Sequence, residues 1–250
     1  MAELTASLAE TVANTNAGPD GDLARDRDLG NIVYSNPPSS PCCQIYPGHA
    51  YHAARGHSYY RSYLVFDTSG IDTAPLLEVT GTMATSLQIY GRAASDALNI
   101  IVYKANLTSS TAALNNANYN DFDGWVSGSA FTGSIYGKFL TGSVMTVYPA
   151  ANAYQPITGT AALSDAMQNE DLVSLVILEY DHDAQYDADV EASRGPWVVG
   201  SGGWTGGASP PKIVYAAGTT QSKTLGVTPG NQKSILGTTR DKTAKVGGRV

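Results

Sequence analysis

Acidic residues crowd into one short stretch in the second half of the chain, between positions 181 and 191. Ca²⁺ is bound in proteins by several carboxylate and carbonyl oxygens, so such a stretch is a candidate calcium loop. Its candidate ligands are Asp181, Asp183, Asp187 and Asp189. The spacing lacks the Asp-x-Asp-x-Asp-Gly pattern with a distal glutamate that marks an EF-hand loop. A solvated acidic loop, or a contact for a basic segment, is the alternative interpretation.

Three histidines, His49, His52 and His57, lie close together in the sequence. A metal site requires imidazoles that converge and further groups that fix their tautomers. Pro47-Gly48 and Gly56 flank these histidines and predict a loop, where convergence is not enforced. The sequence therefore favours structural or solvent-facing histidines over a metal site.

The three tryptophans are candidate sugar-stacking residues. Trp204 lies in the glycine-rich segment Gly202–Gly207, where an exposed aromatic ring would mark an interaction site. Trp197 and Trp204 are therefore candidate glycan-binding residues. Packing of these rings in the core or in a protein interface is the alternative.

No residue pattern typical of catalysis is found. The sequence lacks a Gly-x-Ser-x-Gly elbow, a His-Glu-x-x-His motif and a phosphate-binding loop. Charged residues make up only 15% of the chain. We predict that the protein is not an enzyme and carries no cofactor, with calcium as the one alternative. A glycan-cleaving enzyme is a third hypothesis, because the separation of two catalytic carboxylates is not visible in a sequence.

Export and membrane signals are absent from the sequence. No run of about 18 apolar residues predicts a membrane-spanning helix. Residues 1–28 lack the basic and apolar regions of a signal peptide. Cys42 and Cys43 are adjacent, and adjacent cysteines rarely bridge each other, so no disulfide is expected.

The charge is divided unevenly along the chain. The formal net charge is −7, yet residues 219–250 carry six basic residues and one acid, which leaves −12 for the rest. This division favours a basic segment that docks on an acidic protein surface. A disordered solubilising end is the alternative. Nucleic-acid binding is less favoured, because the basic residues are scattered and no aromatic residue accompanies them.

Short segments of strand-like pattern recur between turn signals. In Tyr59–Asp67, Tyr60, Ser62, Leu64 and Phe66 share one face of a strand, and Tyr59, Arg61, Tyr63 and Val65 share the other. Further strands are expected at 85–91, 98–104, 172–180, 197–199 and 212–216, and one or two edge strands within 131–148. The apolar run 172–180 predicts a central strand buried on both faces.

Helical signals are few. Thr160 is a candidate cap for a short helix within Gly159–Gln168, and residues 2–8 are expected to form a short helix or an arm. We predict an all-β fold, an antiparallel β-sandwich (jelly roll) with extended N- and C-terminal arms. Its predicted parts are an N-terminal arm or first strand (1–30), the sandwich (31–218) and a basic extended arm (219–250).

A family resemblance emerges from these segments. Tyr60–Ile71, which reads YRSYLVFDTSGI, is similar to the R-S-…-F-D-…-S-x-I signature of DNRLRE-type domains. Ala84–Gly91 resembles the family's A-x-L-x-hydrophobic-Y strand, and Ser209–Tyr215 resembles its closing R-P-x-L-x-V-x-Y strand. The segment 157–168 is similar to its turn and short helix, although the tryptophan common there is absent. The resemblance covers roughly residues 55–217.

The resemblance implies a jelly roll related in shape to carbohydrate-binding modules. Such domains occur in bacterial surface proteins and in phage structural proteins, and they bring no catalytic machinery to transfer. The resemblance further implies that Phe66 lies in the core, that Asp67 caps the following turn, and that Arg61 pairs with a carboxylate.

The combined hypothesis is a bacteriophage virion structural protein that is assembled in the host cytoplasm. Within that class we expect a capsid decoration (cement) protein whose terminal arms clamp neighbouring subunits, with a tail, collar or fibre component as the alternative. Expected partners are major capsid or tail proteins and further copies of this chain, without nucleic acid or membrane. The arm residues expected to contact them are Lys223, Leu225, Lys233, Ile235, Leu236, Arg240, Lys242, Lys245 and Arg249. A carbohydrate-binding adhesion module for host-surface glycans is the hypothesis from a different class.

Overall fold

Antiparallel β-structure dominates the protein. The computed structural model describes residues 2–15, 25–34, 47–52, 56–71, 84–91, 99–139, 153–186 and 210–216. The strands are β1 (Ala2–Thr5), β2 (Leu8–Asn14), β3 (Ile32–Tyr34), β4 (Gly48–His52), β5 (Gly56–Asp67), β6 (Ala84–Gly91), β7 (Ile100–Lys104), β8 (Ile135–Phe139), β9 (Ala153–Gly159), β10 (Leu172–Glu179) and β11 (Lys212–Ala216). The helical segments in these ranges include the 3₁₀ turn η2 (Asn116–Asn120), the helix α2 (Ala161–Asn169) and a single π-helical turn, η4 (Tyr180–Ala184).

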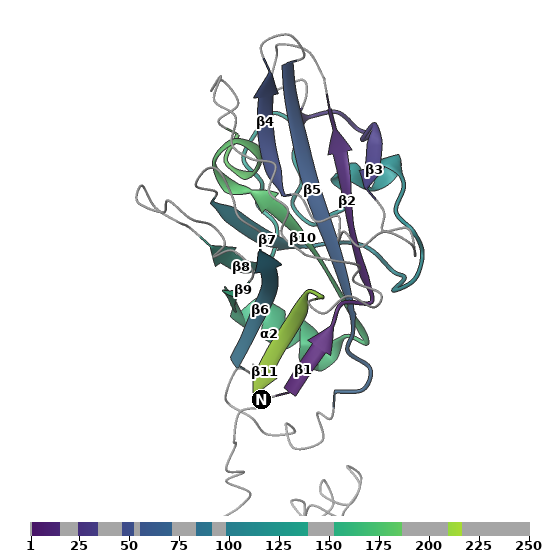
Figure 1. The fold of residues 1–250 in the computed structure, drawn as a ribbon, viewed down its shortest axis with the longest axis vertical. Helices are drawn as coiled ribbons and strands as arrows, with labels where there is room; N and C mark the ends of the chain where they lie inside the picture. The colour runs from purple at the N-terminus through teal and green to yellow at the C-terminus, as the bar shows by residue number, and fades with distance from the viewer. Residues whose placement is uncertain are drawn as a thin grey trace, which may run out of the picture.

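The described strands form one continuous sheet (Figure 1). Their order is β1-β11-β6-β9-β8-β7-β10-β5-β2-β3, and β4 pairs with β5 outside this path. Every pairing along it is antiparallel. The predicted all-β, antiparallel character is therefore confirmed, and β10 is the buried central strand that the apolar run predicted.

The N-terminal strand joins the two ends of this sheet. Consecutive amides make the switch: the Ala6 N–H donates to the Pro211 carbonyl at 3.0 Å, and the Ser7 N–H donates to the Val65 carbonyl at 2.8 Å. Before this point β1 pairs with β11, and after it β2 pairs with β5. Because strands that change partner in this way make the corners of packed sheets, the sheet folds back on itself.

The two faces of β5 pack into two separate cores, as the alternation in its sequence predicted. Leu64 and Phe66 face a core built with α2, β9, β10 and β11. Tyr59, Tyr63 and Val65 face a second core, which residues of the 105–131 segment complete. Phe66 is fully buried, as the family resemblance implied.

Two local predictions of turn and helix capping are confirmed. The Thr160 hydroxyl accepts a hydrogen bond from the Leu163 N–H and caps α2, whose Leu163 and Met167 are buried. The Asp67 carboxylate accepts bonds from the N–H and hydroxyl of Ser69, so it caps the turn after β5.

Two local predictions are wrong, and one alternative for the N-terminus is excluded. Residues 2–8 form no helix; the chain there belongs to β1 and the start of β2, as in the first-strand alternative, because it pairs with β11 and then with β5. Residues 48–52 are not a loop but the strand β4, which pairs with β5, whose first residue, Gly56, has a φ of 80°. Within 131–148, the strand β8 is no edge strand, since it lies between β7 and β9.

Several predictions concern residues that the structure does not describe. The expected strand 197–199, most of the loop after β10 and the whole segment 219–250 lie outside the described residues. Within the described ranges, no helix is both long and apolar enough to cross a membrane.

Candidate functional site

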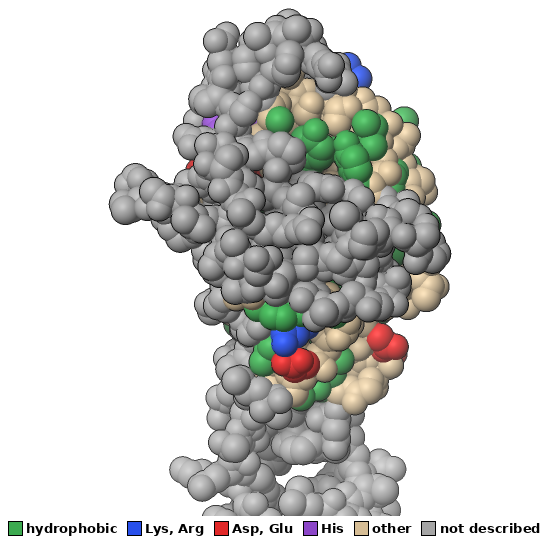
Figure 2. Space-filling model, viewed as in Figure 1, with side chains coloured by type: hydrophobic (Ala, Val, Ile, Leu, Met, Phe, Trp, Pro, Cys, Tyr) green, Lys and Arg blue, Asp and Glu red, His purple; other side chains and the backbone are tan. Residues whose placement is uncertain are grey.

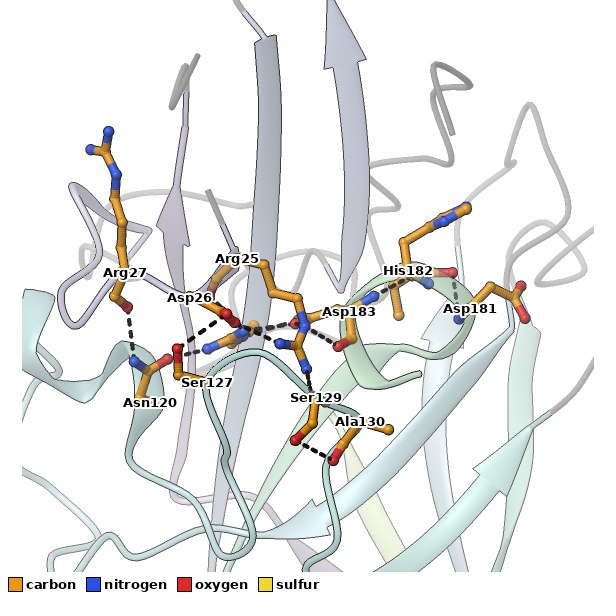
Figure 3. Close-up of polar contacts among 12 residues, drawn as sticks. Arg25, Asp26, Arg27, Asn120, Ser127, Ser129, Ala130, Asp181, His182 and Asp183 are labelled. Atoms are coloured by element: carbon orange, nitrogen blue, oxygen red, sulfur yellow. Dashed lines mark hydrogen bonds and ion pairs between the residues drawn. The ribbon is translucent and has the colours of Figure 1, made fainter. Parts of the chain in front are cut away.

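The chemically active side chains gather on one face of β5. His57, Tyr59 and Arg61 alternate along the strand and therefore point to the same side. The turn η4 packs there, held by the end of β10, and the segment around Arg25 completes the enclosure (Figure 3). All of these polar groups are buried against the second core.

Arg61 is completely buried and fully hydrogen-bonded. Its Nε and Nη2 atoms bond the two carboxylate oxygens of Asp183 at 2.9 and 2.7 Å. Its remaining N–H groups reach the carbonyls of Tyr119 and Arg25, both at 3.2 Å, and the side-chain oxygen of Asn120. Five N–H donors thus find five acceptors. The carboxylate partner that the family resemblance implied for Arg61 is Asp183.

A second arginine closes the same network from the N-terminal side. Arg25 is also fully buried, and its Nε donates to the Asp183 backbone carbonyl at 2.6 Å. Its two Nη atoms donate to the Asp26 carboxylate at 2.6 Å and to the Ser129 carbonyl at 2.7 Å. The guanidinium lies 4.1 Å from the ring centre of Phe131. Two arginines and two aspartates therefore neutralise each other, and they tie three distant chain segments together.

A buried carboxylate organises the π-helical turn. Glu179 accepts backbone N–H bonds from Asp181, His182 and Asp183 at 2.9, 2.7 and 3.1 Å. Burial raises the pKa of Glu179 to about 7, although the nearby His182 and the backbone donors act in the opposite direction. The three bonds hold η4 in the orientation that presents Asp183 to Arg61.

Three histidines from three elements meet beside η4. The Nε2 of His49 and the Nδ1 of His57 are 2.8 Å apart, and their rings stack at 5.1 Å. The His182 ring lies 4.9 Å from that of His49. Burial, together with His182 and His57, lowers the pKa of His49 to about 3. We call His49, His57 and His182 the histidine cluster; sequence spacing pointed to the first two and missed the third.

The ionisable groups around Arg61 are either kept neutral or paired with one another. Burial raises the pKa values of the Tyr59 and Tyr119 hydroxyls well above that of ordinary tyrosine, so both stay neutral. The arginine and aspartate charges are committed to each other. Among the described residues, no group of three or more His, Cys, Asp or Glu side chains has the geometry to hold a metal ion.

Two of the four predicted calcium ligands lie among the described residues, and the other two lie outside them. Asp183 gives both oxygens to Arg61, and Asp181 accepts a bond from the Asn99 side chain at 2.9 Å. Asp187 and Asp189 lie outside the described residues. The described half of the candidate loop is therefore used to fasten η4.

The other predicted site residues are not placed by the structure. Trp197, Trp204 and all the arm residues from Lys223 to Arg249 lie outside the described ranges. Trp125 is described, and it packs against the second core. His52 lies on β4 at the position opposite Gly56.

Both acidic and basic side chains lie on the described surface, and Figure 2 shows examples of each on one face. Of the basic residues whose side chains the structure describes, Arg25 and Arg61 are buried, Lys104 and Lys212 each pair with a glutamate, and Arg27 is exposed. The exposed acids without an ion pair to another described residue are Asp28, Asp67, Asp165 and Asp171. In the described part of the chain, four exposed acids and one exposed base therefore lack an ion-pair partner.

Comparison with known proteins gives no assignment for this chain: no protein-family model matches it, and no curated protein is significantly similar to it.

Proposed function

We propose that this protein is a virion structural protein, a capsid decoration protein whose jelly-roll sandwich is fastened to its neighbours by the basic C-terminal segment. The observation that carries the proposal is the charge division: −12 on residues 1–218 against +5 on residues 219–250. Opposite charges on two parts of one chain favour association of one copy with the next.

The arrangement of the described acids supports this reading. Asp67 and Asp171 lie at adjoining ends of β5 and β10, because Asp67 pairs with Leu172. Asp165 lies on α2, which leads into this end and has no basic residue in its last turn. A helix C-terminus itself carries partial negative charge, so this end of the body attracts cations.

The position of β11 supplies the second support. Tyr215 pairs with Ala2, so β11, the last described strand, ends beside the first strand, at the end where α2 also lies (Figure 1). Ordering each residue of such an arm costs about 1–2 kcal/mol of backbone entropy. Salt bridges alone do not offset that cost, so apolar arm residues such as Leu225, Ile235 and Leu236 must also be buried on the partner.

The buried network fits a non-enzymatic role. Arg25, Arg61 and Asp183 tie the loops to the sheet, and their charges are committed to one another. A rigid body of this kind suits a particle-surface protein, whose function requires mechanical integrity rather than an open site.

The test begins with immunogold electron microscopy of a lysate of the source, using antibody against residues 55–217. Gold spread over icosahedral heads is the expected result. Gold confined to a tail or one vertex would replace decoration by a tail, collar or fibre role. Label on cells, with bare particles, would overturn the virion proposal and favour the glycan-binding module.

The docking step is tested with a full-length variant in which the basic residues of 219–250 become glutamine. The changed residues are Lys223, Lys233, Arg240, Lys242, Lys245 and Arg249. We expect loss of co-sedimentation with particles that lack the protein, with an unchanged unfolding midpoint. The control variant Arg27→Gln removes an exposed cation of the body and should sediment with the particles. Normal binding of the six-residue variant would refute the charge argument.

A further inference from the structure

We propose that the β4–β5 hairpin is an acid-sensitive latch, in which proton uptake by the histidine cluster releases β4 from η4. The inference concerns a conformational change of the isolated chain, and it does not depend on the proposed virion role. It rests on how the cluster is built, on what surrounds it and on where β4 lies in the sheet.

The cluster joins β4, β5 and η4 through buried rings. The exposed fractions of His49, His57 and His182 are 0%, 3% and 3%. His49 is the middle member: it bonds His57 at 2.8 Å and contacts His182 at a ring distance of 4.9 Å. A positive charge on any one ring therefore lies within contact distance of a second histidine, away from water.

The hydrogen bond between His49 and His57 needs a neutral pair or a single added proton. One ring nitrogen must donate and the other must accept, so two fully protonated rings would face each other with two N–H groups. The Nδ1 of His49 is buried and has no hydrogen-bond partner among the described residues. A proton on that atom would have no described acceptor, which buried N–H groups almost always require. The cluster is thus built for the neutral state.

The charged groups that neighbour the cluster are already bonded to other partners. On β5, Tyr59 stacks on the His49 ring at 4.7 Å and its hydroxyl stays neutral. On η4, the Asp183 carboxylate is bonded to the guanidinium of Arg61. At the end of β10, Glu179 interacts with His182, but its oxygens are bonded to three backbone N–H groups of η4 itself.

β4 can separate without dismantling the sheet. Among the described strands it pairs with β5 alone, outside the path that links the other ten. β10, in contrast, is paired on both sides, by β5 and β7. The Glu179 side chain accepts hydrogen bonds from backbone N–H groups of η4, at the other side of the histidine cluster from β4.

Hydrogen exchange of the full-length protein tests the latch. An open His49 with an ordinary pKa of about 6.5 gains a proton between pH 7.5 and 5.5, while the closed form does not, and this raises the opening constant about tenfold. After correction for intrinsic exchange rates, the 47–52 peptide should lose about tenfold protection at pH 5.5. The 172–179 peptide of β10 should lose none.

Two variants give the matched comparison. His49→Gln should abolish the tenfold pH effect on the 47–52 peptide. His52→Gln, which removes the chain's only histidine outside the cluster, should retain it. A pH effect that survives in His49→Gln, or equal loss of protection in β10, would overturn the latch.

If His49→Gln does not fold, a pH titration of the His49 ring signal in the wild-type protein tests the proposal. In the closed protein, the ring signal of His49 should show no protonation step between pH 7.5 and 5. A normal step near pH 6.5 in the folded state would show that the closed hairpin tolerates the charge, and would refute the proposal.

Discussion

Arg61 is the residue whose loss should cost the most among the buried polar groups. Replacing it by methionine keeps the length of the side chain but leaves the Asp183 carboxylate, which is fully buried, without its bidentate partner. The nearest remaining cation is the Nε of Arg25, at 3.7 Å from one carboxylate oxygen. The acceptors on Tyr119 and Asn120 also lose their donors. Breaking a buried pair in this way costs about 3–5 kcal/mol, so we expect about 4 kcal/mol for Arg61→Met.

The control is a partly exposed ion pair of similar length. Lys104 lies 2.6 Å from Glu170, but the two side chains are 36% and 38% exposed. Lys104→Met should therefore cost about 0–1 kcal/mol. Urea unfolding followed by circular dichroism gives both free energies of unfolding. If Arg61→Met costs no more than Lys104→Met, the buried network does not stabilise the fold as argued. If that variant does not fold, Asp183→Asn, which leaves two buried arginines without their shared carboxylate, should show a comparable loss.

The remaining predictions concern a titrating group, two turns and a helix cap. Glu179 has its pKa raised by burial to about 7, so its stabilising contribution is complete below pH 4.5 and is lost as the pH rises to 7. Urea unfolding measures the free energy of unfolding of Glu179→Gln and of the wild type at pH 5 and pH 7. The difference, variant minus wild type, should rise by about 2–3 kcal/mol between pH 5 and pH 7, and a difference independent of pH would contradict the assignment. Gly124→Ala should destabilise far more than Gly128→Ala in thermal unfolding, because both have positive φ but only at Gly124 would a Cβ lie 1.8 Å from the backbone nitrogen of Gly133. Equal costs for the two would show that backbone strain alone matters. Thr160→Ala removes the cap of α2 and should cost about 1 kcal/mol by urea unfolding, whereas an unchanged midpoint would mean that the cap does not contribute.

Features that depend on neighbouring residues could be predicted from the sequence. The alternation along Tyr59–Asp67 predicted which side chains share a face, because successive side chains of a strand point to opposite sides. The run in β10 predicted a buried central strand for the same local reason. The caps by Thr160 and Asp67 span two or three residues and were equally accessible.

Partners far apart in the chain were decided only by the tertiary structure. β2 contains alanine and glutamate, which do not favour strands, yet its pairing with β5 makes it one. His182 joins His49 only because β10 ends beside the hairpin. Arg61 and Asp183 are separated by 122 residues, and no spacing rule connects them. Side-chain alternation is a property of one strand, whereas the meeting of two strands depends on the register and on how the sheet folds back.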